Sequence, residues 1–269
     1  MKVAEARAFP KYISYTIDRK ISRMMDLLTA ANAEQWALTS FLVLAGACLQ
    51  GVSGVGFGMF AAPILAIVAP ELVPGPMLFL SLIIAVLSVA RERASVDMKG
   101  LGCALLGRIP ASIAAAALIG FLPLRELSIV FALVILAGVA MSLARVDVRP
   151  TAPVMFGAGC ISGFMGTLTS VGLPPIALMY QNAPKATLRA SLGGFLIFGT
   201  LISIVALSFA GRFGFHDVAL GTWLIAPLSI GFWISSPLAR RISPGTVRIA
   251  VLGLSAFAAM LLLLRQFYA

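Results

Sequence analysis

Charged side chains are scarce in this sequence. They make up 11% of its 269 residues, whereas hydrophobic residues make up 60%. A soluble globular domain averages about 25% charged residues. The composition therefore excludes an ordinary soluble fold and indicates an integral membrane protein.

Acidic and imidazole side chains are missing from the apolar stretches. All ten carboxylates and the single histidine, His216, lie in the N-terminal arm or in polar segments between apolar runs. A proton-coupled carrier usually needs a buried titratable relay, and no such relay is visible. Cation transport is disfavoured as well, because no carboxylate lies within an apolar stretch where it could bind a metal cation.

Groups that would support catalysis are also lacking. The cysteines Cys48, Cys103 and Cys160 lie in apolar segments, form no CxxC pair and are expected to pack as small hydrophobic residues. One histidine and isolated cysteines offer neither a triad nor a metal site. The phosphate-binding motif GxxxxGK[ST] does not occur, which argues against ATP-driven transport by this chain. We expect a protein that is not an enzyme and has no cofactor or metal.

Positive charge is in excess, with a net charge of +10. Most cations stand between apolar runs, where they orient a membrane protein and contact anionic headgroups, so we expect a lipid bilayer and not nucleic acid as partner. Residues 1–35 carry ten charges and a helical stripe of apolar side chains, which predicts an amphipathic arm on the membrane surface. A solvated, partly disordered arm is the alternative.

The apolar stretches predict an all-α, polytopic fold, because a chain in lipid must satisfy its own backbone hydrogen bonds. Two halves, 36–146 and 150–267, each contain one broken element followed by three plain helices. The stretches lie at about 37–68, 74–90, 100–121, 126–144, 152–182, 190–210, 218–238 and 247–264.

The two halves carry the same pattern of small residues at one offset. The stretches 37–70 and 150–184 are each too long for one span of about 20 residues, and glycine breaks each near its middle. Paired segments of this kind point to a transporter's binding site. A shift of 112 positions places Cys48, Gly51, Gly54, Pro63 and Ile64 on Cys160, Gly163, Gly166, Pro175 and Ile176.

Two topologies are open. If each broken element returns to its own side, each half crosses three times and the second half is inverted relative to the first. Most loop cations then share one side, but the N-terminal arm lies opposite them. If the element crosses instead, the arm returns inside and Arg240, Arg241 and Arg248 move out. We favour inverted repeats and leave the side of the N-terminus open.

The breaks are the candidate anion site. Glycine lets the chain turn and a ligand approach the backbone closely. Pro63 and Pro175 suit the first turn of the half-helix after each break, whose N-terminus offers N–H groups and a positive dipole end. Close helix packing is the alternative explanation of the glycines. The candidate substrate-binding residues are Gly51, Ser53, Gly54, Gly56, Gly58, Ser162, Gly163, Gly166, Thr167, Thr169, Ser170 and Gly172.

Two arginines complete the candidate set. Arg108 is embedded in a span, and a guanidinium suits carboxylate, sulfonate or phosphate oxygens. It lies nine residues after Lys99, so extension of its side chain to an interface is an equal alternative. Arg189 starts the next helix after the second break, where it either caps the cavity entrance or marks the cytoplasmic edge.

The block from Ile161 to Asn182, which contains Ser-Gly-Phe-Met-Gly-Thr-Leu-Thr-Ser-Val-Gly-Leu-Pro-Pro, resembles the second signature of the sulfite exporter TauE/SafE family. The block from Gly51 to Leu65 is similar to its first signature, and the resemblance extends from about residue 40 to the C-terminus. It implies duplicated modules of three membrane helices in a bacterial inner membrane and transport of anions such as sulfite, sulfoacetate and related sulfonates. The glycine run of the second signature is thinned here, and Arg108 has no counterpart in the second half.

We therefore expect a secondary transporter, and more specifically an exporter, of small organic or inorganic anions held between the broken helices. An anion that leaves an inside-negative cell gains about 2.3 kcal/mol per charge per 100 mV, so efflux needs no internal acid. An anion channel of the same architecture is the alternative, and a membrane-embedded enzyme or receptor subunit is a third interpretation. The expected partners are a small anionic substrate and the lipid bilayer, with a homodimer left open.

Overall fold

A computed structural model describes residues 33–54, 56–91, 98–144 and 148–268, and within these ranges it contains eleven α-helices, one 3₁₀ turn and no strand. The all-α prediction is confirmed. Six helices are long and apolar enough to cross a membrane, or seven spans if one bent pair counts as one. The protein is therefore a multi-pass membrane protein. The predicted amphipathic arm lies almost entirely outside the described residues.

The first half supplies five helices. They are α2 (Ala33–Ser53), α3 (Phe57–Val68), α4 (Gly75–Arg91), α5 (Met98–Phe121) and α6 (Leu124–Leu143), with the 3₁₀ turn η1 at Pro70–Leu72. The second half supplies α7 (Ala152–Thr169), α8 (Leu173–Met179), α9 (Lys185–Phe209), α10 (Phe215–Trp223), α11 (Ile225–Leu238) and α12 (Pro244–Tyr268). The chain divides into the compact units Met1–Leu38 and Thr39–Ala269, and the description below concerns the second.

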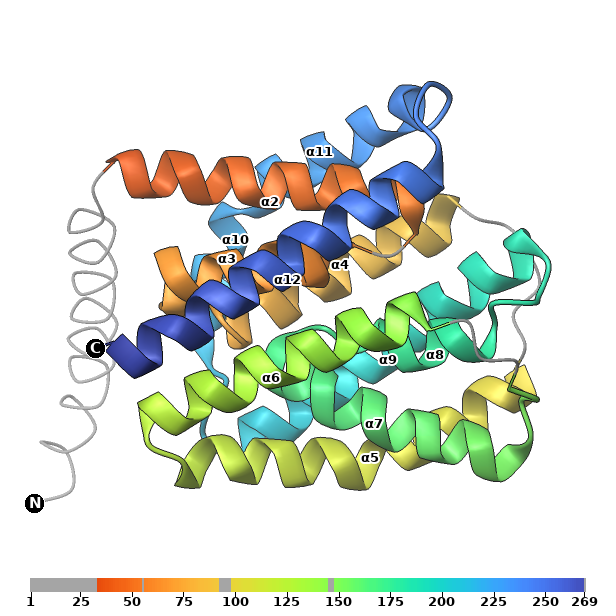
Figure 1. The fold of residues 1–269 in the computed structure, drawn as a ribbon, viewed down its shortest axis with the longest axis horizontal. Coiled ribbons are helices and arrows are strands. Elements are labelled where there is room, and N and C mark those ends of the chain that lie inside the picture. Colours follow the sequence, from red (N-terminus) through yellow and green to blue (C-terminus); the bar gives the residue numbers. More distant parts are fainter. Residues whose placement is uncertain (1–32, 55, 92–97, 145–147, 269) are drawn as a thin grey trace, which may run out of the picture. The chain divides into compact units, whose positions relative to one another are not determined.

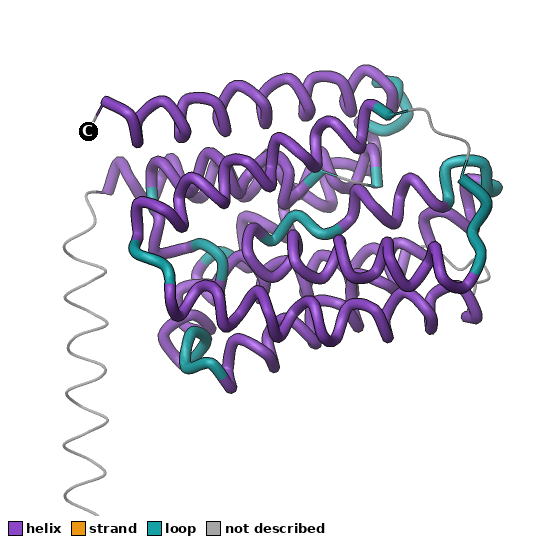
Figure 2. Tube along the Cα trace, turned by 60° about the horizontal axis from the view of Figure 1, so that its bottom comes forward, coloured by secondary structure: helices purple, strands orange, loops and turns teal. Residues whose placement is uncertain are grey.

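Both predicted breaks are present. Helix is interrupted between Ser53 and Phe57 and again between Thr169 and Leu173. Figure 1 shows the long helices running side by side. Figure 2 shows non-helical segments inside the bundle as well as at its ends. Irregular backbone at this depth is tolerated in a membrane protein only where it is enclosed by protein or lines a cavity.

Both broken elements fold back on themselves. A Cβ atom at Gly46 on α2 would lie 3.5 Å from the Cβ of Ala61 on α3, so α3 returns along α2. Met155 near the start of α7 shares a buried cluster with Met179 at the end of α8. In the first half α4, α5 and α6 then remain, and in the second half α9, the bent pair α10–α11 and α12, an odd number of elements such as inverted repeats require. The inversion itself stays a prediction.

A residue with left-handed backbone stands at each turn. Gly54 has φ 79° and Ser170 has φ 60°. Glycine adopts this conformation freely, whereas in a serine it costs about 1 kcal/mol. Ser170 is held by two hydrogen bonds, one from its N–H to the carbonyl of Gly166 (2.9 Å) and one from its hydroxyl to the carbonyl of Pro74 (3.3 Å).

The two halves interlock through glycines. Helix α5 packs along α7, where a Cβ at Gly159 would overlap the carbonyl of Ala104. Helix α11 meets α2 in the same way, because a Cβ at Gly231 would overlap the carbonyl of Leu44. Helices α4 and α9, and helices α6 and α12, also pair across the halves. Small residues let backbones approach this closely, so some glycines of this sequence serve packing.

The predicted position of one proline was wrong. Pro175 lies in the first turn of α8 as expected, but Pro63 is the seventh residue of α3, which begins at Phe57. Because proline has no N–H, it leaves the carbonyl of Met59, four residues earlier, without its helical donor. The hydroxyl of Ser255 on α12 donates to that carbonyl at 2.6 Å. The second half thus supplies the missing hydrogen bond.

The stretch predicted as one plain helix over 218–238 is bent. Helices α10 and α11 meet at an angle of 49° near Leu224. Pro227 lies two residues inside α11, and its ring clashes with the carbonyl of the residue four positions earlier, Trp223, where α10 ends. The proline therefore accounts for the bend.

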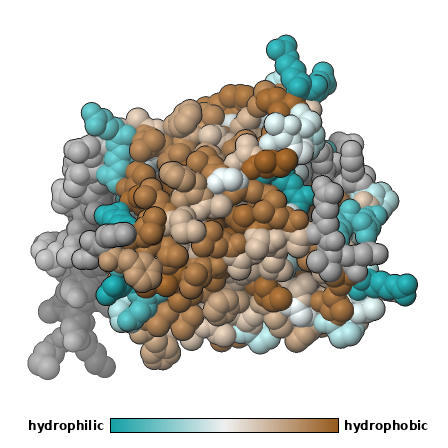
Figure 3. All heavy atoms as spheres, viewed as in Figure 1, coloured by the Kyte–Doolittle hydropathy of each residue, from teal (hydrophilic) through white to brown (hydrophobic). Residues whose placement is uncertain are grey.

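The outer surface suits a hydrocarbon environment. Figure 3 shows one face covered largely by apolar side chains, with hydrophilic ones gathered toward its two ends. Large hydrophobic residues are highly exposed, among them Phe209 at 90% and Trp233 at 73%. An apolar surface of this extent marks contact with lipid or another protein, and here the sequence of apolar spans favours lipid.

Candidate functional site

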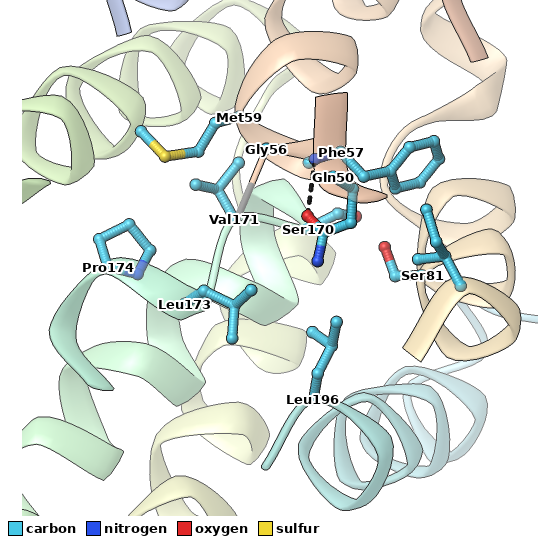
Figure 4. A pocket seen from close by; sticks show the side chains of 13 residues that line it. Gln50, Gly56, Phe57, Met59, Ser81, Ser170, Val171, Leu173, Pro174 and Leu196 are labelled. Carbon is cyan, nitrogen blue, oxygen red and sulfur yellow. Dashed lines mark hydrogen bonds between the residues drawn. The ribbon is translucent and has the colours of Figure 1, made fainter. Parts of the chain in front are cut away.

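A cavity lies where the two hairpins meet. The first turn of α3 touches the second break so closely that a Cβ at Gly58 would overlap the carbonyl oxygen of Ser170. The space beside this contact is a partly open pocket, which we call the central cavity. Its walls are Gly56, Phe57, Gly58 and Met59 of the first break, Ser170 to Pro174 of the second, and Gln50, Ser81, Ile84 and Leu196 (Figure 4).

Gln50 spans the first break. Its side chain is 4% exposed, and its Oε1 accepts a hydrogen bond of 3.0 Å from the N–H of Phe57, the first residue of α3 (Figure 4). Its Nε2 donates to the carbonyl of Gly54 at 3.1 Å. The N–H groups of a first helical turn have no acceptor within their own helix. Gln50 satisfies the first of these, and the next two residues of α3, Gly58 and Met59, also line the central cavity.

Ser162 plays a related part at the second break. It lies 112 positions after Gln50, so the two occupy equivalent places in the predicted repeat. The Ser162 hydroxyl donates to the carbonyl of Gly172, which lines the central cavity. Thr169 adds a local bond, because its Oγ1 accepts from the N–H of Val171 at 3.2 Å. Both turns are therefore tied by polar side chains from the preceding helix, Gln50 at the first and Ser162 and Thr169 at the second.

Arg108 lies behind the wall of the central cavity. It is 1% exposed, so its guanidinium does not extend to an interface. Its Nε donates to the carbonyl of Gly199 (2.9 Å), its Nη1 to the hydroxyl of Ser162 (3.0 Å) and its Nη2 to the hydroxyl of Ser203 (3.1 Å). The ring of Phe195 covers it at 5.1 Å. These partners are all neutral, so the positive charge of Arg108 is not cancelled by them.

Glycines make room for this guanidinium. A Cβ at Gly172 would come within 2.9 Å of Nη1, and one at Gly166 would come within 2.7 Å of Nη2. Gly199 on α9 and Gly163 on α7 are equally close to the Arg108 side chain. Since Gly172 also lines the central cavity, only the backbone of that residue separates the charge from the cavity at this point.

A second cavity adjoins the first. It is also partly open, and it shares Gln50, Leu173 and Leu196 with the central cavity. Arg91 at the end of α4 is the one charged side chain among the described residues that line either cavity. The remaining lining residues are Gly54, Ser88, Leu192 and Gly193.

The predicted site residues divide into three groups. Gly56, Gly58, Ser170 and Gly172 line the central cavity, and Gly54 lines the second. The other hydroxyls bond within the protein: Ser53 to the carbonyl of Leu49, Thr169 to that of Met165, and Thr167 with Ser203. The residues that line neither cavity are Gly51, Ser53, Arg108, Ser162, Gly163, Gly166, Thr167 and Thr169. The side chain of Arg189 lies outside the described part of the structure.

Several lining residues were not among the predicted ones. Gln50 and Arg91 are polar residues at the ends of helices, and Ser81 is buried in α4. One signal pointed to Gln50, namely its offset of 112 from Ser162, which was a candidate. The apolar lining residues, such as Leu196, carry no sequence pattern that separates them from other core residues.

The comparisons with known proteins give one match. A family model described as Sulfite exporter TauE/SafE matches residues 38–262, a range that includes both hairpins and extends into α12. No curated protein and no solved structure matches the chain.

Proposed function

Because the chain belongs to the sulfite exporter TauE/SafE family, we propose that it is a secondary transporter that exports small anions, such as sulfite or sulfonates, across a bacterial inner membrane. The central cavity is the proposed substrate site. Both repeats contribute to it, as expected for a transporter whose site lies between paired broken helices.

The observation that carries this proposal is the electrostatic character of the central cavity. Among the residues that the structure describes, its lining includes no carboxylate, and the polar side chains there are the neutral ones of Gln50, Ser81 and Ser170. The uncancelled charge of Arg108 stands directly behind Gly172. Amide and hydroxyl donors combined with a buried positive charge favour an anion and disfavour a cation.

The driving force follows from the same feature. Since none of the described residues lining the two cavities is a carboxylate or histidine, these residues provide no proton relay. The membrane potential alone supplies about 2.3 kcal/mol per charge per 100 mV for an anion that leaves an inside-negative cell. We therefore propose export driven by potential.

The first test is a ligand-stabilisation screen of the purified protein against sulfite, sulfoacetate, acetate and phosphate, with ethylammonium as a control of opposite charge. We expect at least one anion to raise the apparent melting temperature in a saturable manner, because a ligand that binds only the folded state stabilises it. Stabilisation by ethylammonium alone, or by none of these ions, contradicts the proposal.

Flux in liposomes then separates the two transport mechanisms. Slow, saturable efflux of the stabilising anion that follows an imposed potential supports a carrier. Fast flux that does not saturate indicates a channel of the same architecture. Efflux that follows a pH gradient and ignores the potential contradicts the proposed driving force.

A further inference from the structure

The two cavities lie in series. Gln50, Leu173 and Leu196 contribute to the walls of both, so a single layer of side chains separates them. Helix α4 borders both cavities, with Ser81 in the central one and Ser88 in the second, seven residues or about two turns further along. The second cavity therefore continues from the central one toward the end of α4 that carries Arg91.

Arg91 is fixed in the wall of the second cavity. Its Nη2 donates to the carbonyl of Gly51 at 2.6 Å, and its Nη1 donates to the hydroxyl of Ser235 at 3.1 Å. Its guanidinium lies 4.4 Å from the centre of the Phe232 ring. A guanidinium held by α2 on one side and α11 on the other loses little further freedom when it binds a ligand, which favours recognition of an oxyanion.

We propose that the second cavity is an entry station for the transported anion, in which Arg91 binds the oxyanion, and that Gln50, Leu173 and Leu196 form the partition which the anion crosses to reach the central cavity. This inference rests on the proposed function and extends it by a second binding site and a gating residue. The ligand class is a small oxyanion, such as a sulfonate or sulfite.

Gln50 is suited to act as the movable part of this partition. Its Oε1 occupies the place at the N–H of Phe57 where an anionic oxygen would accept a hydrogen bond. When the side chain turns away, an arriving oxyanion replaces one oxygen by another, so the buried N–H does not remain unsatisfied. Transport requires that each site bind the ion strongly enough for the ion to enter and weakly enough for it to leave. Two binding sites in succession are consistent with this requirement.

Cysteine accessibility tests the inference without knowledge of the physiological substrate. In a protein whose native Cys48, Cys103 and Cys160 are replaced by alanine, Ser88→Cys places a thiol in the second cavity and Ser81→Cys places one in the central cavity. The probes are two methanethiosulfonates of similar size, one bearing an ethylsulfonate and the other an ethyltrimethylammonium group. Size-exclusion profiles confirm that each variant is folded.

Arg91→Gln tests the entry station. We expect the thiol at position 88 to react faster with the sulfonate reagent than with the ammonium reagent, and Arg91→Gln to lower this ratio of rates about tenfold, because a cation in a cleft concentrates anions there. Arg125→Gln is the matched control. Arg125 also donates to a backbone carbonyl, that of Gln266 at 3.0 Å, but lines neither cavity. If Arg91→Gln and Arg125→Gln change the ratio of sulfonate to ammonium reaction rates equally, or if neither changes it, the proposal that Arg91 forms an entry station is wrong.

Gln50→Ala tests the partition. We expect the thiol at position 81 to react with the sulfonate reagent at least about tenfold more slowly than the thiol at position 88, and Gln50→Ala to remove most of this difference. Leu196→Ala is a second variant that opens the same layer without touching the break. Equal rates at positions 81 and 88 in the presence of Gln50 overturn the partition. The cysteine reaction rates report the charge and accessibility of the two cavities and test the entry station and the partition. The proposed function is tested separately, because it fails if the intact protein shows no saturable anion flux. Failure of the inference and failure of the proposed function are therefore distinguishable.

Discussion

Arg108 gives the sharpest test of how the fold favours an anion. We expect Arg108→Gln to weaken binding of sulfite or sulfoacetate about 30-fold. Two unit charges 4 Å apart interact by about 4 kcal/mol at an effective dielectric constant of 20, and an anion across the cavity wall stands at roughly twice that separation. The positive charge of Arg108 then contributes about 2 kcal/mol to the binding free energy of the anion, which corresponds to a change of about 30-fold in Kd.

The assay is a titration of each anion against purified protein, with Kd taken from isothermal calorimetry and stability from thermal unfolding. Arg108→Lys keeps the positive charge but loses the planar guanidinium that donates hydrogen bonds to Gly199, Ser162 and Ser203. We therefore expect it to lower stability while it keeps Kd within about threefold. Ser203→Ala is the control for structural damage. It removes one partner of Arg108 and of Thr167 and should lower stability by about 1–2 kcal/mol without changing Kd.

Two results would refute this reasoning. If Arg108→Gln binds the anions as tightly as the native protein does, the charge behind Gly172 does not reach the cavity. If Ser203→Ala weakens binding as much as Arg108→Gln, the loss comes from disturbed packing, and the field of the guanidinium is not its cause.

Three further substitutions test the breaks. Gly58→Ala should abolish anion flux, since the new Cβ would overlap the carbonyl of Ser170, whereas Gly157→Ala, with open space around it, should leave flux unchanged; equal flux in both would contradict this. Ser170→Gly should change the free energy of unfolding by less than about 1 kcal/mol, because relief of the left-handed backbone and loss of the hydroxyl's hydrogen bond to Pro74 offset each other; a large fall in melting temperature would contradict this. Ser255→Ala should cost about 1 kcal/mol in thermal unfolding, because the carbonyl of Met59 loses its donor; no change would show that another group replaces it.

The sequence was sufficient to predict the broken helices. Glycine at 54 and 56 and the Gly-Leu-Pro-Pro run after Ser170 cannot continue a regular helix without cost, and both breaks occur there. The bend near Leu224 was missed because Pro227 stands in an apolar run, and prolines are also tolerated inside membrane helices.

The residues that line the two cavities could be predicted only in part from the sequence, because side-chain direction depends on tertiary contacts. Gly166 and Gly172 both flank a break, but a Cβ at Gly166 would meet the guanidinium of Arg108 and the backbone of Gly172, whereas Gly172 itself lines the cavity. Gln50 donates a hydrogen bond to the carbonyl of Gly54 and accepts one from the N–H of Phe57 across the break. No local sequence pattern reveals these two hydrogen bonds. Arg91 is positioned by a hydrogen bond to the hydroxyl of Ser235, which lies 144 positions away in the sequence.

The interlocking of the two halves has a consequence for biogenesis. Helix α5 leaves the ribosome before α7 and α9, which later supply the acceptors for Arg108, so its guanidinium first enters the bilayer without them. Insertion of an arginine at the centre of a helix costs about 2.5–3.5 kcal/mol on the scale set by the translocon. The nascent first half must therefore wait in a poorly packed state until synthesis of α9 is complete, and cellular proteases have their best access to the protein during that interval.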